Sequence, residues 1–279
     1  MKRLAILGST GSIGLNSLNV VSQFPERFEV VGLSAGLNIK VLKEQILRFR
    51  PRLVSVIRQD LAETLRNEIA SFPVEIVHGV EGLIQVATHP EVDQVVSAIV
   101  GGVGLIPTLA AVKAGKAVAL ANKESLVMAG KIVMEAVEQH HARLLPVDSE
   151  HCAIFQALLG HQKEDVRRLI LTASGGPFFR LPPTRLREVT VKEALNHPNW
   201  EMGKKVTIDS ASLMNKGLEV IEAFWLFGLP PEKNTLKQNL SSFPLSKRVK
   251  KEDSQFIIIF LPLTGRVVFV GRISKGPSA

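Results

Sequence analysis

The first half of the chain alternates short apolar runs with amphipathic segments, and this alternation constrains the fold more than any other feature. Helical patterns such as 41–48 and 61–70 lie between the apolar runs. Strands that alternate with helices form βαβ units, and the strands of such units pair in parallel. We therefore predict an α/β fold with a parallel sheet built from strands at 3–7, 29–34, 53–57, 75–77, 95–99, 117–121 and 144–147.

The pattern changes near residue 147, where we place a domain boundary. A helix is expected at 153–159 and a strand at 168–173, followed by long loops rich in Gly, Pro and Asn. This second part reads as α+β. We predict domains at 1–147 and 148–233, and a separate basic and apolar tail at 234–279.

The charge distribution argues against a nucleic-acid partner. The net charge is +8, but nine Lys/Arg and two Asp/Glu lie within 233–279, which leaves 25 against 24 in 1–232. The body is therefore nearly neutral. Cys152 is the single cysteine, which excludes an internal disulfide and suits a reducing, cytoplasmic compartment. The apolar run 256–263 is too short to span a bilayer, so we expect no membrane association.

Asp148 and Glu150 are candidate functional residues. They follow an apolar run that reads as the end of a strand, and residues two apart on a strand point to the same face. Carboxylates held close repel one another unless a cation or a shared proton lies between them. The pair predicts either a metal site or an acid/base dyad.

Gly8, Gly11 and Gly14 form a glycine-rich turn between the first strand and the following helix. Glycines let the backbone approach a pyrophosphate, and the helix N-terminus offers free N–H groups to the anion. The strand–turn–helix context favours a dinucleotide site over a turn without a ligand. The second strand ends in 33–38 without the acidic residue that usually holds an NAD ribose, so we favour NADP.

Three further polar segments are ambiguous taken singly. Residues 122–124 (Asn-Lys-Glu) follow a strand, where ligands bind in open α/β sheets, but an exposed helix start explains them equally well. Residues 174–177 suit an anion-binding turn or an ordinary loop. The loop 197–203 carries a His, a Trp and a Met, which suits a lid or a core anchor.

Residues 209–219 read as a capped helix start. Asn215 and Glu219 would share one helical face with Lys216 alongside, although Lys216 and Glu219 could equally form a surface pair. Gly217 costs helix stability, which predicts a close neighbour that needs its missing side chain.

Together these motifs occur in one order that closely resembles the 1-deoxy-D-xylulose 5-phosphate reductoisomerase family. The resemblance rests on Gly-Ser-Thr-Gly-Ser-Ile-Gly at 8–14, Ala-Asn-Lys-Glu-Ser at 121–125, Pro-Val-Asp-Ser-Glu-His at 146–151, Ser-Gly-Gly-Pro-Phe at 174–178, His-Pro-Asn-Trp-Glu-Met-Gly at 197–203 and Asn-Lys-Gly-Leu-Glu at 215–219. It implies a Rossmann-like NADPH-binding domain followed by a catalytic domain that is incomplete here, a homodimer, and conversion of a sugar phosphate in isoprenoid biosynthesis.

The resemblance also implies roles for individual residues. NADPH would contact Thr10, Gly11, Ser12, Ile13, Gly36, Asn38, Asn122, Glu124 and Gly203. Mg²⁺ or Mn²⁺ would be held by Asp148, Glu150 and Glu219. The substrate would contact Lys123, Ser149, Glu150, Ser174, His197, Ser210, Asn215, Lys216 and Glu219. The catalytic residues would be Lys123, Asp148, Glu150, His197 and Glu219, and Trp200 and Met202 would form the lid. Leu37 stands where the family commonly has Lys.

The implied reaction isomerises and reduces 1-deoxy-D-xylulose 5-phosphate to 2-C-methyl-D-erythritol 4-phosphate. Three carboxylates suit a hard divalent ion that polarises a carbonyl. After Lys233 the family would continue with a strand and a His-Pro-Gln-Ser motif, and neither is recognisable. The runs 256–261 and 266–270 are instead expected to pair as a hairpin. The tail reads as a frameshifted or truncated product, and less readily as a divergent C-terminus. Two alternatives follow: a fragment that binds NADPH without turnover, and a plain NADP dehydrogenase with no metal requirement.

Overall fold

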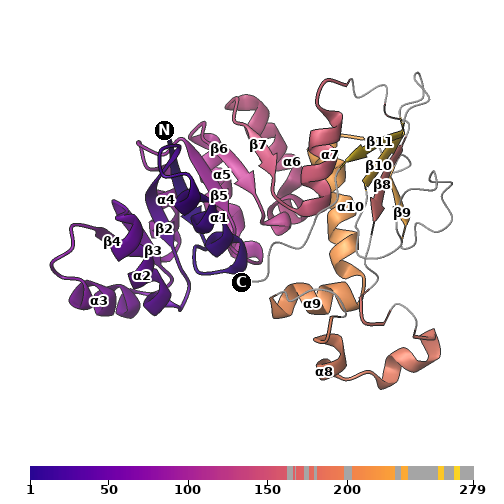
Figure 1. Ribbon diagram of the computed structural model, residues 1–279, viewed down its shortest axis with the longest axis horizontal. Coiled ribbons are helices and arrows are strands. Elements are labelled where there is room, and N and C mark those ends of the chain that lie inside the picture. Colours follow the sequence, from indigo (N-terminus) through magenta and orange to yellow (C-terminus); the bar gives the residue numbers. More distant parts are fainter. Residues whose placement is uncertain are drawn as a thin grey trace. The chain divides into compact units, whose positions relative to one another are not determined.

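The computed structural model describes residues 1–161, 166, 168–172, 176–178, 181–197, 203–229, 234–237, 257–260 and 267–270. The chain divides into two compact units, Met1–Val147 and Asp148–Ala279, whose elements are labelled in Figure 1. The finer division at residue 233 stays a prediction.

A seven-stranded parallel sheet forms the centre of the first unit, which confirms the predicted α/β class. Its strands run in the order β4-β3-β2-β1-β5-β6-β7, and every neighbouring pair is parallel. All seven predicted strands are present, with ends that differ by one or two residues. Their bounds are β1 Lys2–Leu7, β2 Phe28–Ser34, β3 Leu53–Val56, β4 Glu75–His78, β5 Gln94–Ser97, β6 Ala117–Leu120 and β7 Leu144–Pro146.

Helices follow the strands in alternation, as the amphipathic segments predict. The helices at the two ranges named from the sequence are α2 and α3, each within two residues of the predicted ends. The helices of this unit are α1 Ser12–Gln23, α2 Ile39–Phe49, α3 Gln59–Glu68, α4 Gly79–Thr88, α5 Leu105–Lys113 and α6 Lys123–Gln139, with a short 3₁₀ helix at Gly102–Gly104.

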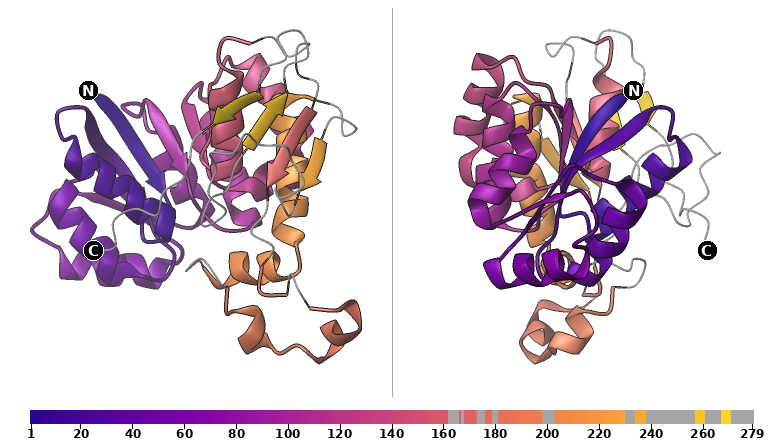
Figure 2. Two further views of the ribbon diagram at one scale, coloured as in Figure 1. Left: turned by 45° about the vertical axis from the view of Figure 1, so that its right-hand side comes forward. Right: turned by 90° about the vertical axis from the view of Figure 1, so that its left-hand side faces the viewer.

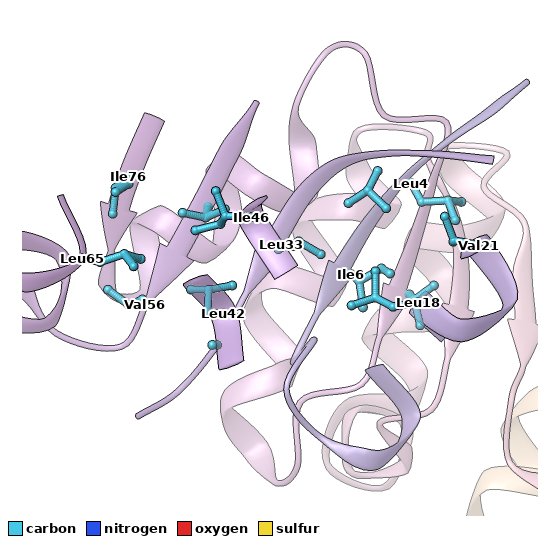
Figure 3. Packing of buried hydrophobic residues seen from close by; sticks show 14 of the residues in the cluster. Leu4, Ile6, Leu18, Val21, Leu33, Leu42, Ile46, Val56, Leu65 and Ile76 are labelled. Carbon is cyan, nitrogen blue, oxygen red and sulfur yellow. The ribbon is translucent and has the colours of Figure 1, made fainter. Parts of the chain in front are cut away.

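One face of the sheet packs on α1, α2 and α3. Leu4 and Ile6 of β1 are buried on this face with Leu18 of α1, because alternate strand residues point to the same side. Leu42 and Ile46 of α2 extend the same apolar cluster (Figure 3).

The opposite face is covered as well, which explains why the strands read as near-continuous apolar runs. Gly32 of β2 lies against α4, where a Cβ at this position would approach Val86 Cγ1 to 2.9 Å. Figure 2 shows helices on both sides of this sheet.

The order of strands reverses beside β1. Successive strands from β1 to β4 lie on one side of β1, whereas β5 to β7 lie on the other. The loops that follow β1 and β5 therefore diverge, and such a reversal is where open α/β sheets bind ligands at the carboxyl ends of their strands.

The second unit contains a smaller four-stranded sheet, in the order β11-β10-β8-β9. Ile154 and Ala157 of α7 share its core with Leu169 and Leu171 of β8 and Ala223 of α10. The elements described in this unit are α7 Ser149–Leu158, β8 Arg168–Thr172, a 3₁₀ helix Pro183–Glu188, α8 Val191–Ala194, α9 Lys204–Ala211, α10 Met214–Phe227, β9 Asn234–Lys237, β10 Ile257–Phe260 and β11 Val267–Val270.

The tail contributes strands to this sheet. β10 and β11 pair antiparallel, which confirms the expected hairpin, and β10 also pairs with β8. The expectation that no strand directly continues the chain after Lys233 was wrong, because β9 begins at Asn234 and pairs in parallel with β8. Asn and Lys are uncommon in strands, so the composition of β9 does not predict a strand. Its pairing with β8 is what makes this segment a strand.

None of the described helices has the length and apolar character that crossing a bilayer requires.

An ion pair joins the starts of β1 and β5. The Arg3 backbone N–H donates to Asp93 Oδ2 at 2.9 Å and its Nη2 donates to Oδ1 at 2.9 Å. The hydrogen bonds from Arg3 hold the pKa of the Asp93 carboxyl at about 2. Because the pKa is lowered on folding, this stabilisation is present above about pH 4 and is lost as the pH falls towards 2.

We therefore expect Asp93→Asn to lower the free energy of unfolding at pH 7. Both side chains are 39% exposed, so solvent screening limits the loss to about 1 kcal/mol or less. Urea unfolding of both proteins between pH 7 and pH 2.5 measures this loss, and the difference should shrink below pH 4. A difference that grows on acidification would contradict the assignment.

Candidate functional site

Asp148 and Glu150 converge at the start of a helix, not along a strand. β7 ends at Pro146 and α7 begins at Ser149, so Asp148 is the N-cap and its Oδ1 accepts the Ser149 N–H at 3.1 Å. The predicted strand geometry was therefore wrong, although the carboxylates do meet. A carboxylate at a helix N-cap satisfies a free N–H, and this favours the helix start over continued pairing.

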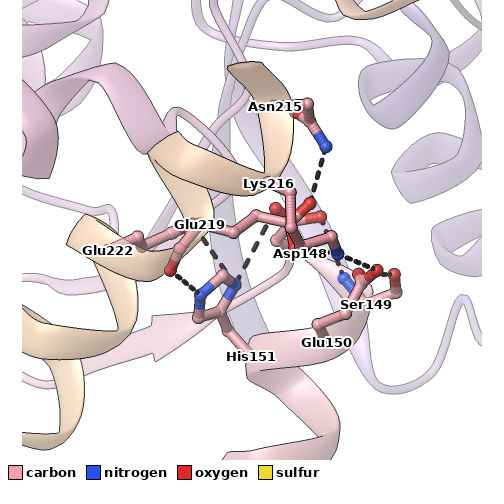
Figure 4. Close-up of polar contacts among 8 residues, drawn as sticks. All are labelled: Asp148, Ser149, Glu150, His151, Asn215, Lys216, Glu219 and Glu222. Carbon is pink, nitrogen blue, oxygen red and sulfur yellow. Dashed lines mark hydrogen bonds and ion pairs between the residues drawn. The ribbon is translucent and has the colours of Figure 1, made fainter. Parts of the chain in front are cut away.

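Three carboxylates from two helices come together in the second unit. One oxygen from each of Asp148, Glu150 and Glu219 lies within 4.8 Å of the others. Glu150 is 4% exposed and Glu219 is 1% exposed. Buried carboxylates at this separation need a cation or a shared proton between them, because their mutual repulsion is poorly screened away from water. The three carboxylates form a group that could hold a metal ion, which is one of the two alternatives that the sequence leaves open (Figure 4).

Lys216 supplies a cation to this cluster. Its Nζ donates to Glu150 Oε1 at 2.9 Å and also to Glu219 Oε2. Burial alone lowers the pKa of Lys216, but attraction to the two carboxylates outweighs it and the pKa is raised. Lys216 is therefore an ammonium at neutral pH, and the Lys216–Glu219 pair is buried rather than on the surface.

Two further donors complete the hydrogen bonding of the glutamates. Asn215 Nδ2 donates to Glu219 Oε1 at 2.6 Å, as their shared helical face predicts, and Ser149 Oγ donates to Glu150 Oε2. The residues predicted at 148–150 and 215–219 therefore form one connected site (Figure 4).

His151 and Glu222 belong to this site and were missed from the sequence. Both are fully buried, and His151 Nδ1 lies 3.3 Å from Glu222 Oε2. His151 Nε2 lies 2.8 Å from the backbone carbonyl of Glu219. A carbonyl only accepts, so Nε2 is assigned as the donor. The i, i+3 spacing of Glu219 and Glu222 places them on one helical face and is the signal that could have pointed to Glu222.

The glycine turn of the first unit has the backbone contacts that a nucleotide loop requires. Gly8 has φ +82°, and a Cβ there would approach Ala98 O to 2.7 Å. A Cβ at Gly14 would lie 2.4 Å from Gly8 O. No side chain caps α1 at Gly11, and Gly11, Ser12 and Ile13 are exposed at the helix start. A ligand can therefore approach the N-terminus of α1 closely.

The loop after β2 lies beside this turn. Ser9 N–H donates to Ser34 O at 2.8 Å, and Gly8 N–H donates to Ser34 Oγ at 3.0 Å. Gly36 and Asn38 are exposed, and Asn38 caps α2 by accepting the Val41 N–H at 3.2 Å. Leu37, where the family commonly has Lys, is 67% exposed.

Asn122 organises the loops after β5 and β6. Its Nδ2 donates to Ile99 O at 2.6 Å, to Gly101 O at 2.9 Å and to Glu124 Oε2 at 3.1 Å. Its Oδ1 accepts the Ser125 N–H at 3.2 Å. The Asn122 side chain therefore shapes the loop itself, and Lys123 is held buried beside it.

The remaining predicted residues are only partly described. Ser210 lies in the last turn of α9, where Gly176 (φ +66°) packs so closely that a Cβ would approach Ser210 O to 2.6 Å. His197 is buried, and Gly203 is the exposed N-cap of α9. Ser174, Trp200 and Met202 lie outside the described residues.

Two expectations about 209–219 were wrong. Residues 209–211 end α9 rather than start a helix, and α10 begins at Met214 after Leu213 in the left-handed region at φ 61°. A Cβ at Gly217 would meet no atom of the described residues within 4 Å apart from the backbone of its own helix, so no neighbour in that part of the chain requires the missing side chain.

Family models match most of the chain. One, described as 1-deoxy-D-xylulose 5-phosphate reductoisomerase, matches residues 4–130. Another, described as 1-deoxy-D-xylulose 5-phosphate reductoisomerase C-terminal domain, matches residues 144–227.

Curated relatives described as 1-deoxy-D-xylulose 5-phosphate reductoisomerase include proteins from Geotalea uraniireducens (strain Rf4) and Geobacter metallireducens. The chain is 59% and 60% identical to them over 233 residues, which is 84% of this chain. It spans 60% and 61% of their lengths.

Solved structures agree with this similarity. A DOX-P reductoisomerase in complex with NADPH, fosmidomycin and magnesium is 38% identical, with a TM-score of 0.87 over 98% of this chain and 67% of that chain. The enzyme from Zymomonas mobilis in complex with NADPH is also 38% identical, with a TM-score of 0.86 over 98% of this chain and 68% of that chain.

The open surroundings of Gly217 predict a stabilising substitution. We expect Gly217→Ala to raise the free energy of unfolding by about 0.5–1 kcal/mol, because alanine restricts the unfolded chain and fits the helix. Gly176→Ala is the control and should destabilise, since Gly176 has positive φ and no room for a Cβ. Urea denaturation measures both, and a destabilised Gly217→Ala would show that the position is constrained.

Proposed function

Since the chain belongs to the 1-deoxy-D-xylulose 5-phosphate reductoisomerase family, we propose that it converts 1-deoxy-D-xylulose 5-phosphate to 2-C-methyl-D-erythritol 4-phosphate with NADPH and a divalent metal ion. The observation that carries this proposal is the cluster of Asp148, Glu150 and Glu219, in which both glutamates are buried. A dehydrogenase without isomerase action has no need of such a cluster.

The first unit supplies the nucleotide site. Gly8 and Gly14 leave a cradle that a Cβ would fill, and the start of α1 offers N–H groups to a pyrophosphate. Thr10, Gly11, Ser12 and Ile13 would lie against the phosphates, with Gly36 and Asn38 near the ribose. NADPH supplies the hydride. Asn122, Glu124 and Gly203 stay predicted contacts.

The second unit supplies the metal site, and its donors fit a hard cation. Asp148, Glu150 and Glu219 offer carboxylate oxygens, the ligands that Mg²⁺ and Mn²⁺ prefer. The three side chains carry formal negative charges that a divalent ion would largely neutralise. Once bound, such an ion polarises the substrate carbonyl as a Lewis acid.

The substrate would be bound by side chains that are already clustered. Ser149, Asn215 and Lys216 present hydroxyl, amide and ammonium donors, which suit hydroxyl and phosphate oxygens. Ser210, Ser174 and Lys123 are proposed to join them on the strength of the resemblance. Trp200 and Met202 stay the proposed lid.

His197 is proposed to bind the substrate as a neutral imidazole. Burial lowers its pKa, so it is uncharged at neutral pH. A neutral imidazole can both donate to and accept from a hydroxyl group, and this suits a sugar better than a fixed charge does.

Membership of the family supports further proposals about the pathway, the oligomeric state, the metal ion and the location of the protein. We propose a role in isoprenoid biosynthesis, a homodimer, use of Mg²⁺ or Mn²⁺, and a cytoplasmic location, which the free Cys152 suits.

The test is the substrate-dependent oxidation of NADPH followed by absorbance, with and without Mg²⁺. We expect turnover that requires the ion and stops with EDTA. Activity insensitive to EDTA would favour a plain dehydrogenase. Nucleotide binding without turnover would leave the chain a binding fragment and contradict the proposal.

Glu219→Gln tests the metal site with little change of shape. We expect turnover to fall by roughly 100-fold or more, since a ligand charge next to the polarised carbonyl is lost. Glu188→Gln is the matched control, because Glu188 is exposed and its ion pair in the described part of the chain is with the exposed Arg185, at 3.4 Å. Equal activity of the two variants would refute the role of Glu219.

Gly14→Ala tests the nucleotide loop. The added Cβ would meet Gly8 O at 2.4 Å, so the turn must open. We expect NADPH affinity, measured by fluorescence titration, to fall by about tenfold or more, because phosphate binding depends on close backbone approach. Ser17→Ala, in the same helix, loses only the bond to Ile13 O and should bind like the parent chain.

A further inference from the structure

Every oxygen of the two buried glutamates accepts a side-chain hydrogen bond. Glu150 accepts from Lys216 at Oε1 and from Ser149 at Oε2. Glu219 accepts from Asn215 at Oε1 and from Lys216 at Oε2. Of these four bonds, the one from Lys216 to Glu150 joins the first turn of α10 to the first turn of α7, and the other three lie within one helix or the other (Figure 4).

The same three donors are those proposed to bind the sugar phosphate. Ser149, Asn215 and Lys216 therefore have two alternative acceptors, the carboxylates and the substrate. Hydrogen bonds are directional, so an N–H or O–H aimed at a carboxylate must turn away before that same N–H or O–H can serve a phosphate oxygen with full geometry.

Lys216 is also a competitor for the metal position. Its ammonium lies on one oxygen of Glu150 and one of Glu219, and the oxygens that could hold an ion come from these residues and Asp148. An ammonium and a divalent ion repel one another, and the repulsion is strong at a site where Lys216 is only 7% exposed. The two cations cannot share these oxygens.

We propose that Lys216 is a positioning residue that holds Glu150 and Glu219 together as an internal cation and moves to the substrate phosphate when a divalent ion takes the carboxylates. Asn215 follows it, because its amide releases Glu219 Oε1 in the same exchange. The proposal rests on the proposed function for the identity of the ion and of the anion.

Cooperative binding follows from this exchange. The ion frees Lys216 for the phosphate, and the phosphate removes Lys216 from competition with the ion. Coupling between two ligands is reciprocal, so each should tighten the other by the same factor, and such factors are commonly about 5–150-fold.

The experiment measures Mn²⁺ binding to the full chain by the EPR signal of free Mn²⁺, with and without inorganic phosphate. For the parent chain we expect phosphate to tighten Mn²⁺ binding by about fivefold or more. For Lys216→Met we expect Mn²⁺ without phosphate to bind about tenfold more tightly than in the parent chain, because the competing cation is gone. Phosphate should then change the Mn²⁺ affinity of Lys216→Met by less than about twofold.

Two other variants control for the loss of a positive charge and for misfolding. Lys205→Met removes the same charge from α9, where Lys205 pairs with Asp209 at 2.9 Å, and should behave like the parent chain. Lys216→Gln keeps a hydrogen-bond donor without the charge, so it should fold where Lys216→Met does not and should show the same tightening.

The outcomes separate this proposal from the proposed function. Lys216→Met or Lys216→Gln with unchanged or weaker Mn²⁺ affinity would overturn the exchange while leaving the metal site intact. Phosphate coupling that persists in these variants would overturn it as well. If neither the parent chain nor any variant binds Mn²⁺, the metal assignment itself fails and the exchange fails with it.

Discussion

The contact of the Lys216 ammonium with Glu150 and Glu219 is the interaction on which the second unit depends. It joins α7 to α10 across 66 positions of sequence, in surroundings where two carboxylates would otherwise repel. Asp148 adds a third carboxylate from the cap of α7, and His151 ties the backbone of Glu219 to the same helix. A buried pair of this kind adds little net stability compared with apolar packing. Its importance here lies in arranging oxygens that a divalent ion can take over.

The first unit depends on a different constraint, namely the close approach of backbone segments around the turn after β1. Gly8 and Gly14 leave no room for a Cβ, and Ser34 receives two N–H groups from the turn. The buried Ser9 hydroxyl donates a hydrogen bond of 2.6 Å to Gln45 Oε1, and this bond fixes the turn against α2. Rigid support of this kind lets the exposed residues 11–13 present their N–H groups without rearrangement, and we take this as the reason the loop suits a dinucleotide.

Local periodicity predicted most of the fold and about half of the site. All seven parallel strands were found, most of them because they are buried along their length, although β4 at the sheet edge is exposed at Glu75 and His78. Asn215 and Glu219 were placed together by helical spacing. Features set by distant contacts were not found. β9 exists through its pairing with β8, and His151 meets Glu222 only because α7 packs near α10. The convergence of Asp148 and Glu150 was expected for the wrong reason, since the helix begins one residue after Asp148.

Transfer of the hydride is the most direct test of the proposed activity. NADPH deuterated at C4 would be incubated with the full chain, Mg²⁺ and 1-deoxy-D-xylulose 5-phosphate, and the products analysed by mass spectrometry. A branched methylerythritol phosphate carrying the deuterium is the result that the account predicts. An unbranched sugar alcohol phosphate carrying the deuterium, or unchanged substrate and cofactor, would contradict it.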